Sequence, residues 1–320
     1  MQGKPKVYVL DPYHADAIAL LQSFGDIHVV LPTDPRKSDW YSDADGLLLR
    51  SETRLGEADF KEARKLRVIV KQGAGVDNID LEAAKAAGVA VHNTPALNSE
   101  AVAELCLALT LSLSRRVCEI DRRIRRGEKV VRSQTLGLSL FQKTIGIIGM
   151  GNIGRESARK WKRAFDAKII GYDPVVLEDA WADIEHTRVK NVDQLLREAD
   201  VVSLHVPLLP TTRGMIGTRE LGLMKKQAIL INAARGGLVD EKALLVVLKQ
   251  GRIWGAVLDA MEVEPPTKES CGEFLELDNV IVTPHIGAST IENQSNSGSA
   301  AVRILRGVLR GDAGVVGKLV

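Results

Sequence analysis

The sequence predicts an α/β protein with two doubly wound parallel sheets. Short β-branched or apolar runs alternate with helix-like stretches along the whole chain, which is the pattern of parallel strands joined by crossover helices. The length of 320 residues exceeds that of a usual single domain. A glycine-rich turn after an apolar strand begins only at Gly149, so another domain must precede it.

The first series of apolar runs predicts the strands of a small domain. They are KVYVL from Lys6, IHVVL from Ile27, GLLLR from Gly46, RVIVKQ from Arg67 and VAVHN from Val89. A last helical pattern, from about Thr290 to Arg310, can return to this domain and close it. We therefore expect one discontinuous domain of residues 1–97 and 289–320, and a second domain of residues 98–288.

A long apolar stretch between the two series keeps helical spacing from about Ala101 to Val117. With Asn98 or Ser99 as the N-cap, it predicts one helix of about 25 residues. A helix of that length commonly crosses between domains or packs in a subunit interface. The basic run RRIRRGEK at its end, Arg122 to Lys129, is interpreted as a solvated helix terminus, because cations suit helix C-termini.

The second series predicts six further strands, which is the count of a full dinucleotide-binding sheet. They are TIGIIGMG from Thr144, AKIIGYDP from Ala167, VVSLHVP from Val201, AILINAA from Ala228, GAVLDA from Gly255 and VIVTPHIG from Val280.

The first of these strands leads into a G-x-G-x-x-G turn made by Gly149, Gly151 and Gly154. Such glycines permit a tight turn and the close approach of a pyrophosphate, which then rests on the helix N-terminus. Asp173 ends the next strand, where a carboxylate can accept both adenosine-ribose hydroxyls. NAD is expected rather than NADP, because Asp173 would repel a 2′-phosphate and the following Pro174 carries no charge.

Three chemically complementary side chains follow the last strands of this series: Arg235, Glu264 and His285. Because the strands are parallel, their carboxyl ends should share one edge of the crevice. Arg235 can pair with a substrate carboxylate and polarise the adjacent C2 oxygen, and His285 can exchange the C2 hydroxyl proton. Glu264 can hold the imidazole and raise its pKa. Taken singly, each residue has a structural explanation as well: an ion pair, a core histidine or a loop charge.

Bulk composition limits the partners. A net charge of +2, with 45% hydrophobic and 26% charged residues, gives no global case for nucleic acid or membrane binding. No segment has the uninterrupted apolar length that a bilayer needs. The cysteines, Cys106, Cys118 and Cys271, lack metal spacing, so we expect free thiols in a reducing, cytoplasmic compartment and no metal.

Over essentially its whole length the chain resembles the D-isomer-specific 2-hydroxyacid dehydrogenases. The resemblance is carried by GAGVDNID (Gly73 to Asp80), HNTP, NSEAVAE, GMGNIGRE, GYDP, HVPLLPTTRGMI, INAARGGLVDE, GAVLDAMEVEPP and PHIGAST. It implies a Rossmann NAD-binding domain, a smaller flavodoxin-like substrate domain, and reversible hydride transfer between nicotinamide C4 and C2 of a 2-oxo or 2-hydroxy acid. It also implies a homodimer with the long helix in the interface, and cleft closure that excludes water.

The resemblance implies further binding residues. The backbone amides of Ala74, Gly75 and Val76 would hold the substrate carboxylate, and Asp259 would position the nicotinamide. Val206 and Pro207 would border the adenosine. The remaining positions expected against the cofactor are Ala74, Asn152, Ile153, Thr212, Ala233, Ala234, His285 and Ala288.

Two positions depart from the family pattern. Asn152 stands where an arginine often meets the pyrophosphate, so cofactor binding should depend more on backbone N–H groups. Val130 stands where a tryptophan is common, which leaves the shape of the substrate cleft open.

Several motifs are most similar to those of 3-phosphoglycerate dehydrogenases, so 3-phosphoglycerate and 3-phosphohydroxypyruvate are the expected substrate pair. Such a substrate needs a second anion site, for which Arg50, Arg54 and Arg132 are candidates, Arg132 by reaching a neighbouring subunit; surface solvation explains each equally well. Reduction of glyoxylate or hydroxypyruvate is the near alternative. A nucleotide-sensing, corepressor-like binding protein is the alternative from another class.

Overall fold

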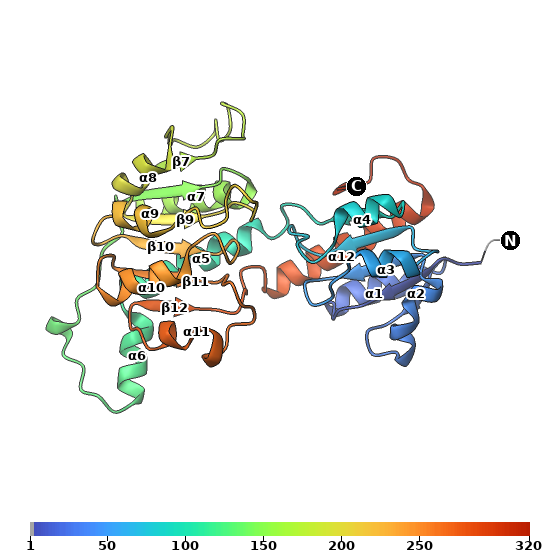
Figure 1. Ribbon diagram of the computed structural model, residues 1–320, viewed down its shortest axis with the longest axis horizontal. Helices are drawn as coiled ribbons and strands as arrows, with labels where there is room; N and C mark the ends of the chain where they lie inside the picture. Colours follow the sequence, from blue (N-terminus) through green and yellow to red (C-terminus); the bar gives the residue numbers. More distant parts are fainter. Residues whose placement is uncertain (1–2) are drawn as a thin grey trace. The chain divides into compact units, whose positions relative to one another are not determined.

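The computed structural model describes residues 3–320, and these divide into two compact units. The first unit contains the residues up to Asn98 together with Ala288–Val320, and the second is Ser99–Gly287. Asn98 and Ala288 thus fall in the first unit, one residue from each predicted boundary. The ribbon of each unit shows a parallel sheet between helices (Figure 1), so the predicted fold class is confirmed.

The first unit is built on a five-stranded parallel sheet in the order β2-β1-β3-β4-β5, which is the flavodoxin-like order. Its strands are β1 (Lys6–Val9), β2 (His28–Val30), β3 (Gly46–Leu49), β4 (Val68–Lys71) and β5 (Ala90–Asn93). Strands β3 and β4 are buried along their whole length, as expected for central strands of a sheet covered on both faces; their residues are apolar except Lys71 at the end of β4.

Helices cover both faces of this sheet. One face packs against α1 (Ala15–Ser23) and α12 (Ile291–Arg310). The other packs against α2 (Trp40–Asp43), α3 (Glu57–Glu62) and α4 (Leu81–Ala86). Thr290 caps α12, since its hydroxyl oxygen accepts a hydrogen bond from Asn293 N at 3.1 Å. The predicted return of the last helix to the first domain is confirmed.

The second unit has a seven-stranded parallel sheet in the order β12-β11-β10-β9-β6-β7-β8. The order reverses at β6, so ligands are expected in the crevice at the carboxyl ends of β6 and β9. The strands are β6 (Thr144–Ile148), β7 (Lys168–Tyr172), β8 (Thr187–Arg188), β9 (Val201–Leu204), β10 (Ile229–Asn232), β11 (Gly255–Leu258) and β12 (Val280–Val282). The sequence did not predict β8, because two polar edge residues carry no strand pattern.

One face of this sheet packs against α5 (Ser99–Ser114) and α7 (Asn152–Phe165). The opposite face packs against α8 (Val192–Glu198), α9 (Thr218–Leu223), α10 (Glu241–Lys249) and α11 (Lys268–Leu275). Asp240 caps α10, as its carboxylate accepts a hydrogen bond from Ala243 N at 3.0 Å.

The prediction of one long helix after Asn98 is wrong. The helix ends at Ser114, and a second helix, α6, spans Val117–Arg125 after Arg116 takes a left-handed φ of 56°. A distant segment causes the break: Leu138 N donates to Ser114 O at 2.8 Å. A Cβ on Gly137 would lie 2.5 Å from the same oxygen, so only glycine permits this approach.

Candidate active site

The turn between β6 and α7 contains three glycines, each with a different surrounding. Gly149 has a φ of +100°, and a Cβ there would lie 2.4 Å from the carbonyl oxygen of His205. A Cβ on Gly154 would lie 2.1 Å from the carbonyl oxygen of Gly149. Gly151 faces open space instead. Packing therefore requires the first and third glycines, whereas the second leaves the backbone accessible to a ligand.

The N-terminus of α7 begins at this accessible point. Gly151 is its N-cap, no side chain caps it, and its first turn has no acidic residue. The N–H groups at the start of the helix, including those of Asn152 and Ile153, therefore present a positive end of the helix dipole. These residues fit the pyrophosphate of a dinucleotide.

Asp173 lies directly after β7 beside the glycine loop. Its Oδ2 accepts a hydrogen bond from Met150 N at 2.9 Å, and its Oδ1 accepts one from Val175 N at 2.9 Å. Arg188 on β8 donates to the carbonyl oxygens of Asp173 at 2.7 Å and Val176 at 2.8 Å. The carboxylate is therefore held against the nucleotide loop by backbone contacts on both sides.

The segment after β9 forms a turn against the same loop. A Cβ on Gly149 would lie 2.9 Å from a methyl group of Val206. The hydroxyl of Thr212 donates to Pro207 O at 2.7 Å and accepts from Leu209 N at 2.8 Å. Val206, Pro207 and Thr212, all predicted to contact the cofactor, thus belong to one turn bordering the glycine loop.

The loop after β10 carries Arg235. Asn232, which is 2% exposed, donates from Nδ2 to Arg235 O at 2.8 Å and to Ala260 O at 3.2 Å. A Cβ on Gly236 would lie 2.0 Å from the carbonyl oxygen of Met261. The Arg235 loop therefore packs directly on the loop after β11. Ala233 and Ala234, which lie between Asn232 and Arg235 in the chain, are both buried.

Glu264 and His285 meet above β11 and β12. His285 Nδ1 lies 2.9 Å from Glu264 Oε2 and 3.1 Å from Oε1. A carboxylate at Nδ1 favours the tautomer with its proton there and leaves Nε2 for another partner. The side chains of His285 and Glu264 are 38% and 36% exposed. A proton can therefore be exchanged at Nε2 without burying a charge.

The backbone of His285 is held in an unfavourable conformation. Its φ is 56°, in the left-handed region that a side chain with a Cβ rarely adopts. Asp259, which is 1% exposed, holds this loop: its Oδ1 accepts from Thr283 Oγ1 at 2.6 Å and Ile286 N at 2.8 Å, and its Oδ2 accepts from Gly287 N at 2.9 Å. The contacts of Asp259 thus fix the position of His285.

A second glycine loop, in the first unit, follows β4. Thr94 Oγ1 accepts from Gly73 N at 2.7 Å, and Asn93 Nδ2 donates to Ala74 O at 2.7 Å. The backbone of Ala74, Gly75 and Val76 therefore lies in a loop that is held by contacts from the end of β5.

Arg50, one of the arginines proposed for a second anion site, is bonded to Asn78 in the segment that follows this loop. Asn78 Nδ2 donates to Arg50 O at 2.9 Å, and Arg50 Nη1 donates to Pro12 O at 3.2 Å. Arg54 is exposed in the same unit. Arg132 belongs to the second unit, in the short 3₁₀ turn Arg132–Gln134.

Ala288 was predicted to contact the cofactor and belongs to the first unit. Its carbonyl oxygen accepts hydrogen bonds from Asn293 Nδ2 at 2.6 Å and Gln294 Nε2 at 2.9 Å, both on α12 of the first unit.

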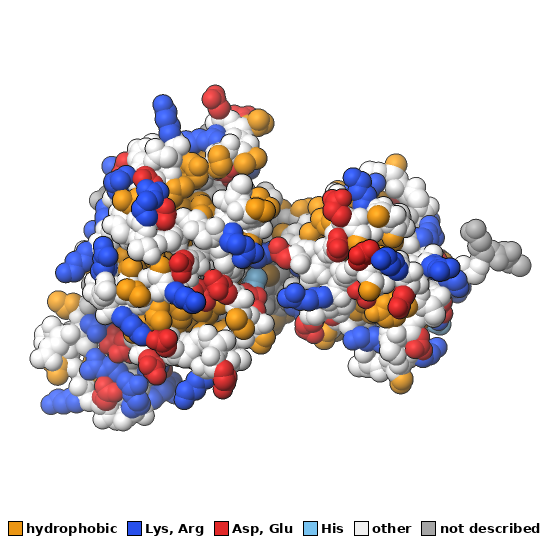
Figure 2. Space-filling model, viewed as in Figure 1, with side chains coloured by type: hydrophobic (Ala, Val, Ile, Leu, Met, Phe, Trp, Pro, Cys, Tyr) orange, Lys and Arg blue, Asp and Glu red, His pale blue; other side chains and the backbone are white. Residues whose placement is uncertain are grey.

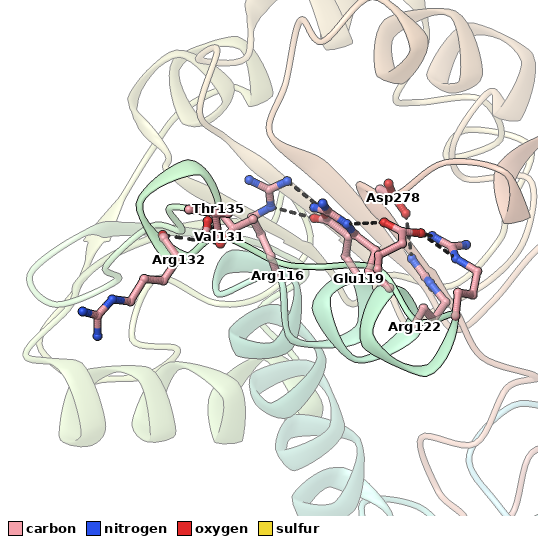
Figure 3. Close-up of polar contacts among 10 residues, drawn as sticks. Arg116, Glu119, Arg122, Val131, Arg132, Thr135 and Asp278 are labelled. Carbon is pink, nitrogen blue, oxygen red and sulfur yellow. Dashed lines mark hydrogen bonds and ion pairs between the residues drawn. The ribbon is translucent and has the colours of Figure 1, made fainter.

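The basic run at the end of α6 is paired with carboxylates rather than left open (Figure 3). Glu119 Oε2 lies 2.6 Å from Arg116 Nε, and Glu119 Oε1 lies 3.2 Å from Arg123 Nη1. The guanidinium of Arg132 points away from these pairs (Figure 3). On the face shown in Figure 2, acidic side chains lie among the basic ones over α6. The interpretation as a solvated helix end fits this arrangement.

Two further observations concern the described chain. Within residues 3–320, no helix is long and apolar enough to cross a membrane. In the same range, no three His, Cys, Asp or Glu side chains are grouped so that they could hold a metal ion. The cysteines at 106, 118 and 271 are free thiols.

Comparison with known proteins shows what this chain is similar to. Residues 107–287 match the model of the D-isomer specific 2-hydroxyacid dehydrogenase, NAD binding domain. A D-3-phosphoglycerate dehydrogenase of Methanocaldococcus jannaschii is 42% identical over 96% of this chain and 58% of its own length. The chain thus spans less than two thirds of that relative.

A hydroxypyruvate reductase of Thermotoga maritima is 40% identical over 92% of this chain and 94% of its own length. Among solved structures, a Thermus thermophilus protein has a TM-score of 0.88 and 33% identity, with 98% of this chain and all of that chain covered (100%).

Proposed function

This chain belongs to the D-isomer-specific 2-hydroxyacid dehydrogenase family, and from that premise we propose that it is an NAD-dependent oxidoreductase interconverting a D-2-hydroxy acid and its 2-oxo acid. One observation carries the proposal: His285 Nδ1 lies 2.9 Å from Glu264 Oε2. Both residues follow strands of the sheet whose β6–α7 turn forms the glycine loop. A histidine oriented by a carboxylate is the acid/base device that a hydroxyl–carbonyl interconversion needs.

Each residue has one role in this reaction. Bound NAD supplies the hydride acceptor, nicotinamide C4, for the hydrogen that leaves C2. As that hydride leaves, His285 Nε2 takes the hydroxyl proton, so the hydroxy acid becomes a 2-oxo acid. Glu264 stabilises the resulting imidazolium through Nδ1. Arg235 binds the carboxylate and polarises the C2 oxygen, because its planar fork matches both. In the reverse direction, His285 gives the proton back.

The cofactor preference follows from Asp173. Its carboxylate is held by backbone N–H groups beside the glycine loop and would accept the ribose hydroxyls while repelling a 2′-phosphate. We expect NADH to bind more tightly than NADPH in a fluorescence titration. In Asp173→Ala the ratio of the NADPH and NADH dissociation constants should fall by about tenfold, since the repulsion of the 2′-phosphate is lost. Tighter NADPH binding by the unaltered protein would overturn the assignment.

The best candidate substrate pair is 3-phosphoglycerate and 3-phosphohydroxypyruvate. It is supported by the name of the Methanocaldococcus jannaschii relative and by two features of the first unit, the loop of residues 74–76 and the nearby Arg50. Glyoxylate or hydroxypyruvate reduction is the second candidate, and the name of the Thermotoga maritima relative favours it. Arg54 and Arg132 remain candidates for the phosphate.

One assay series separates these candidates. NADH oxidation would be followed with phosphohydroxypyruvate, hydroxypyruvate, glyoxylate and an aromatic 2-oxo acid. Two results together would support the phosphorylated substrate. The unaltered protein should have its highest kcat/KM with phosphohydroxypyruvate, and Arg50→Gln should lower this value without lowering the value for glyoxylate. Trace rates with every acid, together with tight binding of a peptide, would favour the corepressor-like alternative.

The assembly and compartment also belong to the proposal. A homodimer is supported by α6, where Val117 is 53% and Ile124 is 58% exposed. A reducing cytoplasm is supported by the free cysteines. Sedimentation velocity on the purified protein tests the first point, because a monomer at micromolar concentration would contradict it.

A further inference from the structure

A carboxylate outside the proposed catalytic residues reaches the loop that carries Glu264. Glu241 is the first residue of α10, and its Oε1 accepts a hydrogen bond from Glu262 N at 2.7 Å. That short distance is typical of a charge-assisted hydrogen bond. The contact joins the start of α10 to the segment after β11, twenty-one residues further along the chain.

The same segment holds Glu264 through the preceding amide. Met261 N donates to Glu264 Oε1 at 3.3 Å, and Glu264 in turn contacts His285. Two consecutive N–H groups of one loop therefore hold two different glutamates. Gly236 packs on the same peptide group, because a Cβ there would lie 2.6 Å from Glu262 N.

The charges around Glu241 make a purely structural role a poor explanation. Burial raises the pKa of Glu241, the Glu262 N–H lowers it, and the carboxylates of Glu262 and Glu264 raise it further. The charge of Glu241 in turn raises the pKa of the Cys271 thiol on α11, after the larger effect of that thiol's burial. The N-terminus of α10 favours the negative charge. A neutral acceptor such as glutamine would hold the Glu262 N–H without this repulsion.

We propose that Glu241 is a positioning residue for the Glu264–His285 pair: it fixes the loop that carries Glu264 and adds a second negative charge that favours the imidazolium of His285. The inference rests on the proposed function for its catalytic meaning. The charge effect itself needs no substrate, because a negative charge near an imidazole favours its protonated form whether or not turnover occurs.

Glu241→Gln tests the charge and keeps an acceptor oxygen. The imidazole titration of His285, followed by NMR and assigned with His285→Gln, should move to lower pH. The limb of the kcat/KM profile that reports His285 should move in the same direction. The KM for NADH should not change. Glu269→Gln, which removes an exposed carboxylate of α11, is the matched control and should move neither curve.

Glu241→Ala tests the loop contact. We expect kcat to fall about tenfold with folding and NADH affinity retained, and Glu241→Asp to recover part of the loss. Superimposable His285 titrations for the unaltered protein and Glu241→Gln would overturn the inference, as would full activity of Glu241→Ala. If the unaltered protein turned over no 2-oxo acid while Glu241→Gln still moved the His285 titration, the proposed function would be contradicted and this inference would not.

Discussion

Two regions of the second unit place a basic side chain against a glutamate, and they differ in what holds the pair. On α6, Glu119 pairs with Arg116 and Arg123 at spacings of three and four residues on one helix. At the edge of the sheet, Glu264 meets His285 across twenty-one residues. The Glu119–Arg123 pair follows from helical periodicity alone, whereas Arg116 is the N-cap of α6 and has a left-handed φ of 56° itself. The Glu264–His285 pair requires two strands, a buried Asp259 and a strained backbone.

The difference indicates what each region is for. A pair between neighbouring positions of one helix stabilises that helix and does not require distant parts of the chain to meet. A histidine held at a left-handed φ has an energetic cost of about 1–3 kcal/mol, which persists only where the surroundings enforce it. We interpret the pair joined across two loops as the chemical site and the pairs of Glu119 as structural contacts at a basic helix end.

The largest expected effect is that of His285→Gln. Turnover should fall by about 10²- to 10⁴-fold because the acid/base group is lost. NADH binding should be nearly unchanged, since the glycine loop and Asp173 are untouched. Steady-state assays and a fluorescence titration measure the two quantities. Near-normal turnover would show that His285 is not the acid/base group. The Glu264–His285 pair would then have no chemical role that the Glu119 pairs on α6 lack.

Arg235→Lys should have the next largest effect. It keeps the charge but loses the planar pairing with a carboxylate, so kcat/KM should fall at least ~100-fold, or about 2.7 kcal/mol of transition-state stabilisation. Arg123→Lys on α6 is the matched control and should leave kcat/KM unchanged. Equal effects of the two substitutions would mean that the sheet edge is not the chemical site.

Glu119→Gln should change stability and not activity. Its carboxylate is 5% exposed and accepts from both arginines, so its loss should cost about 1 kcal/mol of unfolding free energy. The hydrogen bond from Arg116 is the main cause that lowers the pKa of Glu119, against its burial. A lowered folded-state pKa means that the stabilisation is present above pH 4.5 and is lost as the pH falls through the folded-state value.

Urea unfolding of the unaltered protein and Glu119→Gln between pH 3 and pH 7 measures this dependence. The difference between their unfolding free energies should be largest at neutral pH and shrink on acidification. A constant difference would show that the carboxylate charge is not responsible.

The smallest effect is expected for Arg125→Gln, which removes an exposed pair with Asp121 at 2.7 Å. Solvent and salt screen such a pair, so the urea midpoint should stay within experimental error. A clear destabilisation would show that the basic end of α6 is covered by another surface in solution, which would support the proposed homodimer.

Most of the strands could be predicted from the sequence, because short apolar runs such as those at Gly46 and Val201 are buried on both faces and have no other use. The break between α5 and α6 could not. It depends on Gly137 packing against Ser114, a contact between residues twenty-three apart that leaves no local signal.

The candidate site shows the same limit. The positions of Arg235, Glu264 and His285 after consecutive strands could be read from the sequence. The supporting residues could not: Asn232, Asp259 and Glu241 act through hydrogen bonds to backbone groups of other loops. Asn232 and Asp259 are polar residues at the ends of apolar strands and Glu241 is the first residue of a helix, and many structural residues share these positions.

The place of α12 in the first unit has a consequence for biosynthesis. This helix covers β3 and β4, yet it is synthesised after the whole of the second unit. The second unit is contiguous from Ser99 to Gly287, so it can acquire its complete sheet earlier during translation. Until α12 emerges, the part of the amino-terminal sheet that it packs against stays uncovered, and a nascent chain stalled before residue 291 should be bound more strongly by chaperones than one stalled after α12.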